Sequence, residues 1–425
     1  MKRAIVLSGG GSKGAYQIGF WKALKKLNIK YDIVTGSSVG ALNGAFMTQN
    51  VYYKTYYNWN KGMDFSRLFG KDIINDFTTN DGKKEFIKVF GKDILQGGMD
   101  SFGLENILKK YIKPEKIKKS NIDFGLITFN LTTMKPIEIT KHEIKDEEIV
   151  DYLMASATCF PAFKIKDING EKFIDGGYYD NLPINLAIKM GATEVIAVDL
   201  RSISFKQEVK NKNIPITTIK PSKRLPSGLA FNKRIQRKLI KLGYNDTMKV
   251  LGKYDGHLFT FKPEQLNKNY NKYIDRFMYN FNFIFNNDKK SIIAELLNNT
   301  IYNKLINNKE ELPNTFNEMI EYTGKIFKLD ETKIYTINNY NSQLIKKLSY
   351  TSNLNTFAIE KIIKEKDFKN LLNTTFIIKH IYNKLKKRNI EQQIKGIRQL
   401  AIFFPREALS ALYLYTIERN KKARN

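Results

Sequence analysis

The sequence is poor in the residues that build disulfides and metal centres. Its 425 residues include one cysteine and three histidines. A single cysteine excludes an internal disulfide and fits a reducing compartment. No group of His, Cys and Asp residues has the spacing of metal ligands, so the sequence predicts no metal site. We expect the one thiol, Cys159, which follows a predicted helix, to be buried and inert, as free cysteines usually are.

Long apolar runs are also missing. The first run, Ala4–Leu7, is stopped after four residues by the polar Ser8 and glycines 9–11. A signal peptide needs an apolar stretch of about 7–15 residues, and a membrane-spanning helix needs about 20. We find neither, and we therefore expect a soluble, cytoplasmic protein.

Acidic residues are scarce. The sequence has 42 Asp and Glu against 71 Lys and Arg, which gives a formal net charge of +29. The excess is densest in residues 201–260, where 14 basic residues face 3 acidic ones. A basic nucleic-acid-binding protein is one alternative, but residues 261–425 carry no zinc, RNP or helix-turn-helix signature. Nucleic acid is therefore not the expected partner.

The segment 220–242 combines this charge with an apolar stripe. It holds eight basic residues and no acidic one. Phe231, Ile235, Leu239 and Leu242 fall at helical spacing on one face. A basic amphipathic helix predicts peripheral contact with an anionic membrane, here at the inner membrane face. The alternative is that the stripe packs on the rest of the protein and that the basic side chains are only solvated.

Strands and helices alternate along the first 200 residues. Strands are predicted at 3–7, 33–34, 121–131, 136–140 and 195–198, and helices at 15–27, 39–49 and 151–158. This order predicts an α/β fold with an open, mostly parallel sheet between helices. We expect a hydrolase domain over 1–200, a basic extension over 201–260, and an all-α accessory domain over 261–425. Arg406–Arg419, behind Pro405, is one of its predicted helices.

A strand-to-helix turn carries the first chemical signal. Gly36-x-Ser38-x-Gly40 lies between the apolar end of a strand, Ile33-Val34, and the helix that starts at Val39. This is the spacing of a nucleophile elbow, which holds a serine hydroxyl out of the sheet edge. Gly and Ser also form ordinary turns and helix caps, so the motif alone is weak.

A glycine-rich turn follows the first strand. Gly9, Gly11 and Gly14 match G-x-G-x-x-G, and Asp32 stands where a ribose ligand would follow. A dinucleotide-binding oxidoreductase is therefore one interpretation. The other is that consecutive glycine N–H groups form an oxyanion hole for acyl transfer. Asp175-Gly176-Gly177, at the end of a later strand, is by itself a common turn signal.

Taken together, these motifs resemble those of the patatin-like phospholipase family. The glycine-rich turn at 9–14, Gly-x-Ser-x-Gly at 36–40 and Asp-Gly-Gly at 175–177 occur in the family's order. Gly243-Tyr244-x-Asp246 is similar to the bacterial branch. The resemblance covers residues 1 to about 250. Supporting stretches lie at Ala155-Ser156-Ala157, Asn181-Leu182-Pro183-Ile184 and 191–199.

The resemblance implies a serine-dependent lipid acyl hydrolase of the phospholipase A or lysophospholipase type. Ser38 would be the nucleophile and Asp175 its general base, without a metal, a histidine or a cofactor. A triad that recruits His257 is the alternative, but Ser38 follows only the second predicted strand, which favours the dyad. The oxyanion hole would use Gly9, Gly10, Gly11, Ser12 and Lys13, supported by Gly14, Gly36, Gly40, Gly176 and Gly177.

Overall fold

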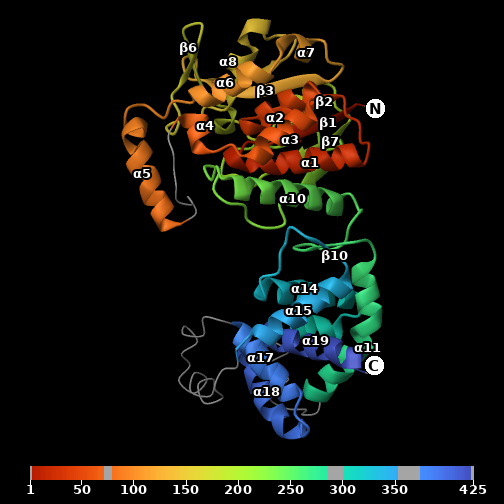
Figure 1. Ribbon diagram of the computed structural model, residues 1–425. Helices are drawn as coiled ribbons and strands as arrows, with labels where there is room; N and C mark the ends of the chain where they lie inside the picture. Colours follow the sequence, from red (N-terminus) through yellow and green to blue (C-terminus); the bar gives the residue numbers. More distant parts are fainter. Residues whose placement is uncertain (1, 71–78, 286–299, 353–373, 423–425) are drawn as a thin grey trace. The chain divides into compact units, whose positions relative to one another are not determined.

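The computed structural model describes residues 2–70, 79–285, 300–352 and 374–422. It divides into two compact units, Met1–Leu251 and Gly252–Asn425. Figure 1 shows their elements, coloured along the sequence. Among the described residues, no helix combines the length and the apolar character needed to cross a membrane.

An eight-stranded sheet forms the centre of the first unit. Strands β3, β2, β1, β7 and β8 run parallel in that spatial order, and β4, β5 and β6 are antiparallel additions. The open, mostly parallel sheet predicted from the sequence is therefore confirmed. The strands are β1 (Arg3–Leu7), β2 (Ile33–Ser37), β3 (Asp123–Asn130), β4 (Lys135–Thr140), β5 (Lys166–Ile168), β6 (Glu171–Asp175), β7 (Glu194–Val198) and β8 (Ile216–Ile219).

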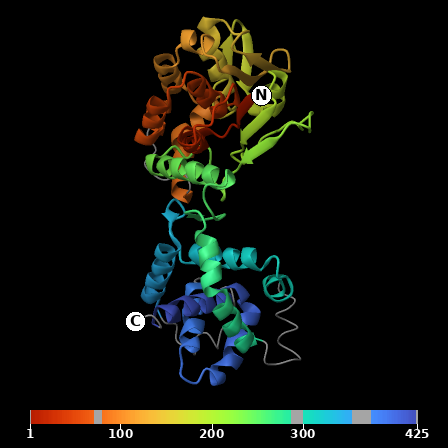
Figure 2. The ribbon, with the colours of Figure 1, turned by 90° about the vertical axis from the view of Figure 1, so that its right-hand side faces the viewer.

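Helices cover both faces of this sheet. They are α1 (Gly14–Lys26), α2 (Val39–Thr48), α3 (Tyr52–Lys61), α4 (Phe65–Phe69), α5 (Asn80–Leu95), α6 (Phe102–Tyr111), α7 (Pro114–Lys118), α8 (Ile149–Ser156), α9 (Ile184–Lys189) and α10 (Lys233–Val250). Figure 2 shows the strands to one side of the layer that contains α1 and α10.

Strand β1 explains why two apolar cores form. Ile5 and Leu7 pack into the core shared with α1, α2 and α10. Ala4 and Val6 pack into a smaller core with α9. Successive side chains of a strand point to opposite faces, so a continuous apolar run suits a strand that is buried on both sides.

The apolar stripe of α10 is buried. Leu239 and Leu242 belong to the main core, and Phe231 and Ile235 pack partly against it. The basic side chains of the helix, for example Arg234 and Lys238, are exposed. The stripe is thus not available to enter a membrane, which corrects the amphipathic part of the prediction for 220–242. The burial of the stripe does not affect these basic side chains, which are exposed to solvent.

Two glycines let α1 and α10 touch. A Cβ at Gly19 would lie 2.0 Å from the carbonyl oxygen of Ile240, and one at Gly243 would lie 1.9 Å from that of Tyr16. Asp246 accepts a buried hydrogen bond of 3.0 Å from the Tyr16 hydroxyl. The Gly243-Tyr244-x-Asp246 stretch therefore joins these two helices.

The second unit is helical around one apolar core. Its helices are α11 (Gln265–Phe285), α13 (Thr300–Asn307), α14 (Leu312–Ile326), α15 (Ile337–Tyr350), α17 (Thr374–Leu385), α18 (Glu391–Phe403) and α19 (Pro405–Lys422). Helix α19 contacts α11, α14, α15, α17 and α18, and so lies at the centre. Two short parallel strands, β9 (Thr260–Phe261) and β10 (Ile334–Tyr335), are also present.

The start of the second unit is fixed by one buried carboxylate. Glu321 accepts the backbone N–H groups of His257, Leu258 and Phe259 at 2.8, 3.1 and 3.0 Å. Residues 252–260, which the sequence prediction placed in the basic extension, thus belong to the same compact unit as the helices. The roles of the three predicted segments stay predictions.

Candidate active site

Ser38 occupies a sharp turn between β2 and α2. Its φ of 54° and ψ of −132° lie outside the regions that L-residues favour. A Cβ at Gly36 would lie 2.4 Å from the carbonyl group of Gly40, and a Cβ at Gly40 would lie 2.1 Å from the Leu7 oxygen. Only glycine fits these two positions, so the Gly-x-Ser-x-Gly spacing builds the elbow that the sequence predicts.

The register of β3 brings Ser38 to Asp175. Strand β2 pairs with β3 up to Ser37, opposite Ile127. Strand β6 arrives from the other direction and ends at Asp175, opposite Thr128. Since β4 occupies the other edge of β3 along this stretch, β2 and β6 share one edge and meet end to end. The residue after β2 and the last residue of β6 are therefore neighbours.

Asp175 is a buried carboxyl with defined partners. Its Oδ1 accepts the Gly177 N–H at 2.7 Å, and the Ser38 hydroxyl is close enough to affect its pKa. Burial raises its pKa from 3.8 to about 6, against the opposing effects of the Ser38 hydroxyl and the Gly177 N–H. A carboxylate with this pKa is a base near neutral pH, and it lines the same cavity as Ser38.

Ser156 fixes the backbone of the turn at Ser38. Its hydroxyl accepts the backbone N–H of Ser38 at 3.0 Å and donates to the carbonyl of Ile127 at 2.6 Å. This fully buried side chain ties the end of α8 and strand β3 to the turn. The sequence predicts Ala155-Ser156-Ala157 only as a stretch that supports the resemblance and predicts no role for Ser156 in the site. A serine between two alanines at a helix end was the one feature that could have indicated this role.

The glycine-rich turn faces Ser38 from the end of β1. Gly9 donates its N–H to the Asn181 carbonyl at 3.2 Å, and Ser12 donates to Gly228 at 2.7 Å. Lys13 donates its backbone N–H to Gly10 at 3.2 Å. Among the described loop contacts, no protein carbonyl accepts from Gly10 or Gly11. The N–H groups of these two glycines therefore have no carbonyl acceptor in the described part of the chain, and the oxyanion role of the five predicted residues stays a prediction.

Two glycines of this turn are required by close contacts. At Gly11, with a φ of +57°, a Cβ would lie 2.3 Å from the Gly228 oxygen. At Gly14, a Cβ would lie 2.4 Å from a methyl group of Val39. The turn is thus pressed against both the elbow helix and the segment around Gly228.

Lys13 extends from the same turn toward the cavity. Its Nζ lies 3.4 Å from the Ser202 hydroxyl. Burial, followed by the nearby charge of Arg224, lowers the pKa of its ammonium, while Asp199 acts in the opposite direction. The side chain is half-buried and adds positive charge close to the turn.

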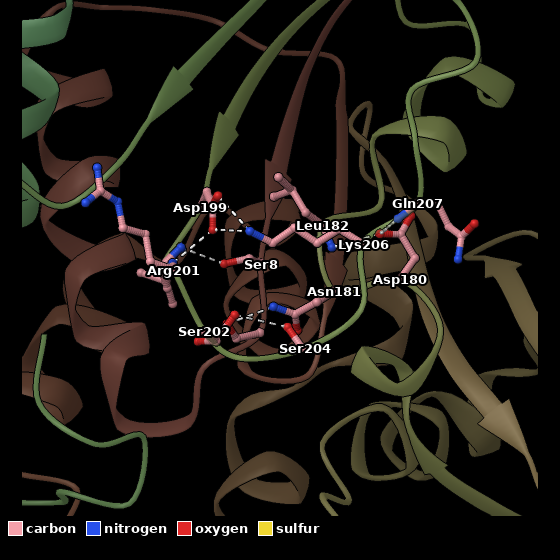
Figure 3. A network of polar contacts seen from close by, with 12 residues as sticks. Ser8, Asp180, Asn181, Leu182, Asp199, Arg201, Ser202, Ser204, Lys206 and Gln207 are labelled. Carbon is pink, nitrogen blue, oxygen red and sulfur yellow. Dashed lines mark hydrogen bonds and ion pairs between the residues drawn. The ribbon is translucent and has the colours of Figure 1, made fainter. Parts of the chain in front are cut away.

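Asn181 connects the turn to the Asp-Gly-Gly segment. Besides accepting from Gly9, its side-chain amide donates to the Gly9 carbonyl at 3.4 Å. Figure 3 shows Asn181 beside Ser202 and Ser204 in the polar network around it. The sequence interpretation assigned Asn181 no site role, because a buried amide after a turn has no spacing that marks it.

A cavity of about 1130 Å³ opens over these groups. Ser38 and Asp175 line it together with Gly10, Gly11 and Lys13. Apolar side chains form much of the remaining wall, among them Leu42, Phe46, Met63, Leu68, Leu104 and Phe231. The cavity is large enough for an acyl chain, and its polar groups converge at one place.

The exposure of Cys159 differs from the sequence prediction. The thiol is exposed rather than buried, and it lines the cavity with Asp175 and Tyr178. The protein around it and the charge of Asp175 raise its pKa, while a hydrogen bond with Tyr178 acts in the opposite direction. The sequence prediction failed because the chain leaves α8 directly at the cavity wall.

Two alternative site residues lie elsewhere. No histidine is among the described residues that line the cavity, and His257 belongs to the second unit. Asp32 precedes β2, whereas the glycine-rich turn follows the parallel strand β1. The turn therefore lies at the carboxyl ends of these parallel strands and Asp32 at their amino ends. Asp32 accepts the Arg3 N–H at 2.9 Å. A ribose at the turn would be out of its reach.

The chain is similar to a family of known proteins. Residues 5–188 match the family model described as Patatin-like phospholipase. Patatin-like phospholipase domain-containing protein 7 from Mus musculus is 29% identical over 210 residues, which cover 47% of this chain and 14% of that protein. Neuropathy target esterase sws from Drosophila melanogaster is 30% identical over 207 residues, with coverages of 47% and 13%. Lysophospholipase nte1 from Aspergillus terreus is 28% identical over 204 residues, with coverages of 47% and 12%.

The chain spans only a small part of these curated relatives, at most 14% of their length. Among solved structures, VipD from Legionella pneumophila is similar at 13% identity and a TM-score of 0.38, over 98% of this chain and 91% of that chain. This last likeness carries no argument about function. Assignment to a bacterial branch stays a prediction.

Proposed function

Since residues 5–188 match the family model described as Patatin-like phospholipase, we propose that the chain is a serine-dependent lipid acyl hydrolase. The substrate class is acyl esters of membrane glycerolipids, as in a phospholipase A or lysophospholipase. The observation that carries the proposal is that Ser38, on its strained turn, and the buried Asp175 carboxyl both line one largely apolar cavity.

Ser38 is the proposed nucleophile. Its oxygen attacks the ester carbonyl while its proton passes to Asp175, and a tetrahedral oxyanion forms. The N–H groups of Gly10 and Gly11 are the proposed donors to that oxyanion. Collapse of the intermediate breaks the ester bond, and the proton on Asp175 goes to the leaving alcohol. Water, deprotonated by Asp175, then releases the fatty acid from the acyl-enzyme.

The apolar cavity wall is the proposed acyl-chain site. Leu42, Phe46, Met63 and Leu68 line the cavity that contains Ser38. Burial of methylene groups against them favours long acyl chains at about 0.8 kcal/mol for each CH₂. We place the activity in the cytoplasm, peripheral to an anionic membrane that the exposed basic side chains of 220–242 attract. This location stays a prediction.

The test compares single-atom changes in neighbouring residues. Ser38→Ala and Asp175→Asn should each abolish hydrolysis of a short soluble ester and of phospholipid vesicles, because they act as one unit. The matched control is Ser37→Ala. The Ser37 oxygen is buried without a hydrogen-bond partner among the described residues, so its loss should leave the rate unchanged. Full activity of Asp175→Asn, or lost activity in His257→Ala, would exclude the dyad.

A further inference from the structure

The loop that follows β7 exposes two large apolar side chains. We define residues 201–206 as the rim loop. Ile203 is 103% exposed and Phe205 is 67% exposed. Single exposed apolar residues are common on protein surfaces, but two on one short loop mark a candidate contact surface.

The rim loop is held in place by its backbone. Asn181 donates its N–H to the Phe205 carbonyl at 2.8 Å, and Phe205 donates to the Gly177 carbonyl at 3.3 Å. The Ser202 hydroxyl donates to the Gly9 carbonyl at 3.1 Å. The loop is thus bonded to both the glycine-rich turn and the Asp-Gly-Gly segment. Figure 3 shows Arg201, Ser202 and Lys206 of this loop in the polar network.

An ion pair closes the same frame. Lys206 Nζ lies 2.8 and 2.7 Å from the two carboxylate oxygens of Asp199. Asp199 also accepts the backbone N–H of Arg201 at 2.9 Å. Arg201 itself has a φ of 50°, a conformation that costs free energy in a non-glycine residue. These contacts stabilise a loop shape that leaves Ile203 and Phe205 in solvent.

The exposed side chains border the candidate active site. Ile203 and Phe205 line the same cavity as Ser38 and Asp175. The apolar surface of the loop is therefore continuous with the cavity wall. A lipid that leaves a bilayer at this loop would meet apolar surface along its path to Ser38.

The charge of the cavity rim favours an anionic surface. Arg201, Lys223 and Arg224 line the cavity, and Asp175 is the acidic residue among the described lining groups. Arg224 is exposed and is close enough to lower the pKa of Lys13. Apolar side chains surrounded by cations are suited to a bilayer whose headgroups are anionic.

We infer that the rim loop inserts Ile203 and Phe205 into an anionic phospholipid bilayer and so docks the cavity on its substrate surface. The inference rests on the proposed lipid hydrolase function. It replaces the apolar stripe of α10, which is buried, with a different membrane-contacting element. Arg201, Lys223 and Arg224 supply the attraction to the headgroups.

The experiment measures binding without turnover, in the Ser38→Ala background. Vesicles of phosphatidylcholine that contain phosphatidylglycerol are sedimented with the protein. Ile203→Ser combined with Phe205→Ser should raise the vesicle dissociation constant about tenfold or more, because the apolar burial is lost. The control is Met134→Ser, which removes an apolar side chain that is 68% exposed on the β3–β4 turn. Unfolding midpoints should stay close to that of the parent in all variants.

A second arm tests the charges. Arg224→Gln should weaken binding to the anionic vesicles and leave the weaker binding to pure phosphatidylcholine unchanged. Lys135→Gln, an exposed lysine beside Met134, serves as its control. Equal losses in Arg224→Gln and Lys135→Gln, or unchanged binding of the double serine variant, would overturn the inference.

Two further outcomes are distinguishable. Sedimentation velocity measures self-association of the parent and of the double serine variant. If the parent self-associates, the variant does not, and the variant binds vesicles normally, the loop joins copies of the chain and the inference fails. If the protein with Ser38 intact hydrolyses no ester while the vesicle binding depends on Ile203 and Phe205, the proposed function fails and the docking surface stands.

Discussion

Asp175 is a carboxyl group in a place that favours its neutral form. Its pKa of about 6 results chiefly from burial. Because the proposed base must be ionised, we expect kcat/KM for a soluble ester to rise about tenfold for each pH unit below 6 and to level off above about 7. A pH–rate profile on a substrate without ionisable groups measures this. A midpoint near 4 would contradict the assignment of Asp175 as the base.

The same pKa has a consequence for stability. Between pH 4 and 6 the Asp175 carboxyl binds more protons in the folded protein than in the unfolded chain, so its contribution to the free energy of unfolding falls as the pH rises through this window. A displacement of the pKa from 3.8 to about 6 corresponds to roughly 3 kcal/mol. In Asp175→Asn this decline should be absent, as denaturant titrations of both proteins at a series of pH values would measure.

A side chain at Gly10 should impair catalysis. A Cβ there would lie 2.8 Å from the Ser202 hydroxyl and 3.0 Å from a methyl group of Leu200. Gly10→Val should therefore displace the N–H groups of the turn, and loss of one oxyanion donor costs about 10²–10³ in kcat. Gly91→Ala, on the helix α5, is the control, because its nearest neighbour is a methyl group at 3.6 Å. A wild-type kcat in Gly10→Val would make the turn purely structural.

The two residues of the dyad differ in how far the sequence reveals them. Ser38 has a local signal, because the strand end, the two glycines and the helix start lie within a few residues. Asp175 came only from the resemblance to a family. Its proximity to Ser38 depends on where β2 and β6 end along β3, and strand register is not visible in a single sequence. The exposure of Cys159 was missed because residues distant in the sequence form the cavity wall that it joins after α8.

At the scale of elements, helix α8 is joined to the elbow by one hydroxyl. Ser156→Ala would leave the Ser38 N–H and the Ile127 carbonyl without their present partner. We expect kcat to fall about 10–100-fold with little change in KM, since small displacements of a nucleophile are costly. Unpaired buried groups should also lower the unfolding free energy by about 1–3 kcal/mol.

The control for this prediction lies on the same helix end. Thr158 donates its hydroxyl to the Met154 carbonyl at 2.9 Å, whereas the Ser38 N–H is bonded to Ser156. Thr158→Val should therefore lose stability without the same loss of kcat. If both variants lose kcat equally, Ser156 has no special role in holding the elbow.

For helix α10, the sequence predicted the helix but not its C-terminal end or its packing partner. The apolar spacing of Phe231–Leu242 correctly indicated a helix with one buried face. The helix continues to Val250, because Gly243 does not end it but lies against Tyr16 of α1. A glycine inside a helical pattern can mean an end or a close contact. The choice between membrane and core as the partner of the stripe needed the positions of both helices.

At the scale of the whole molecule, the chain forms two units that the sequence divided at a different place. The predicted boundary followed the change to Asn- and Lys-rich sequence after residue 260. The structure divides after Leu251, because β9 pairs with β10 and Glu321 binds the backbone of 257–259. Such contacts between distant residues leave no periodic pattern in the sequence.

Glu321 gives a prediction at this scale. Glu321→Ala would leave three N–H donors, one buried and two part-buried, without their carboxylate. We expect the second unit to lose about 3 kcal/mol of stability, seen as one thermal transition moved to lower temperature while the other stays. Hydrolysis of a soluble ester should be unchanged at temperatures below both transitions. Glu318→Gln, an exposed carboxylate on the same helix, is the control, and a single transition that shifts as a whole would contradict independent units.

Cys159 makes the cavity addressable by chemistry. The sequence has one cysteine, and it is exposed at the wall beside Asp175. A maleimide dye would therefore attach at one defined position without any mutation. Because the pKa of the thiol is raised, labelling should be slow at neutral pH and faster in alkaline buffer. The attached fluorophore would then report the arrival of a lipid by a change in its emission.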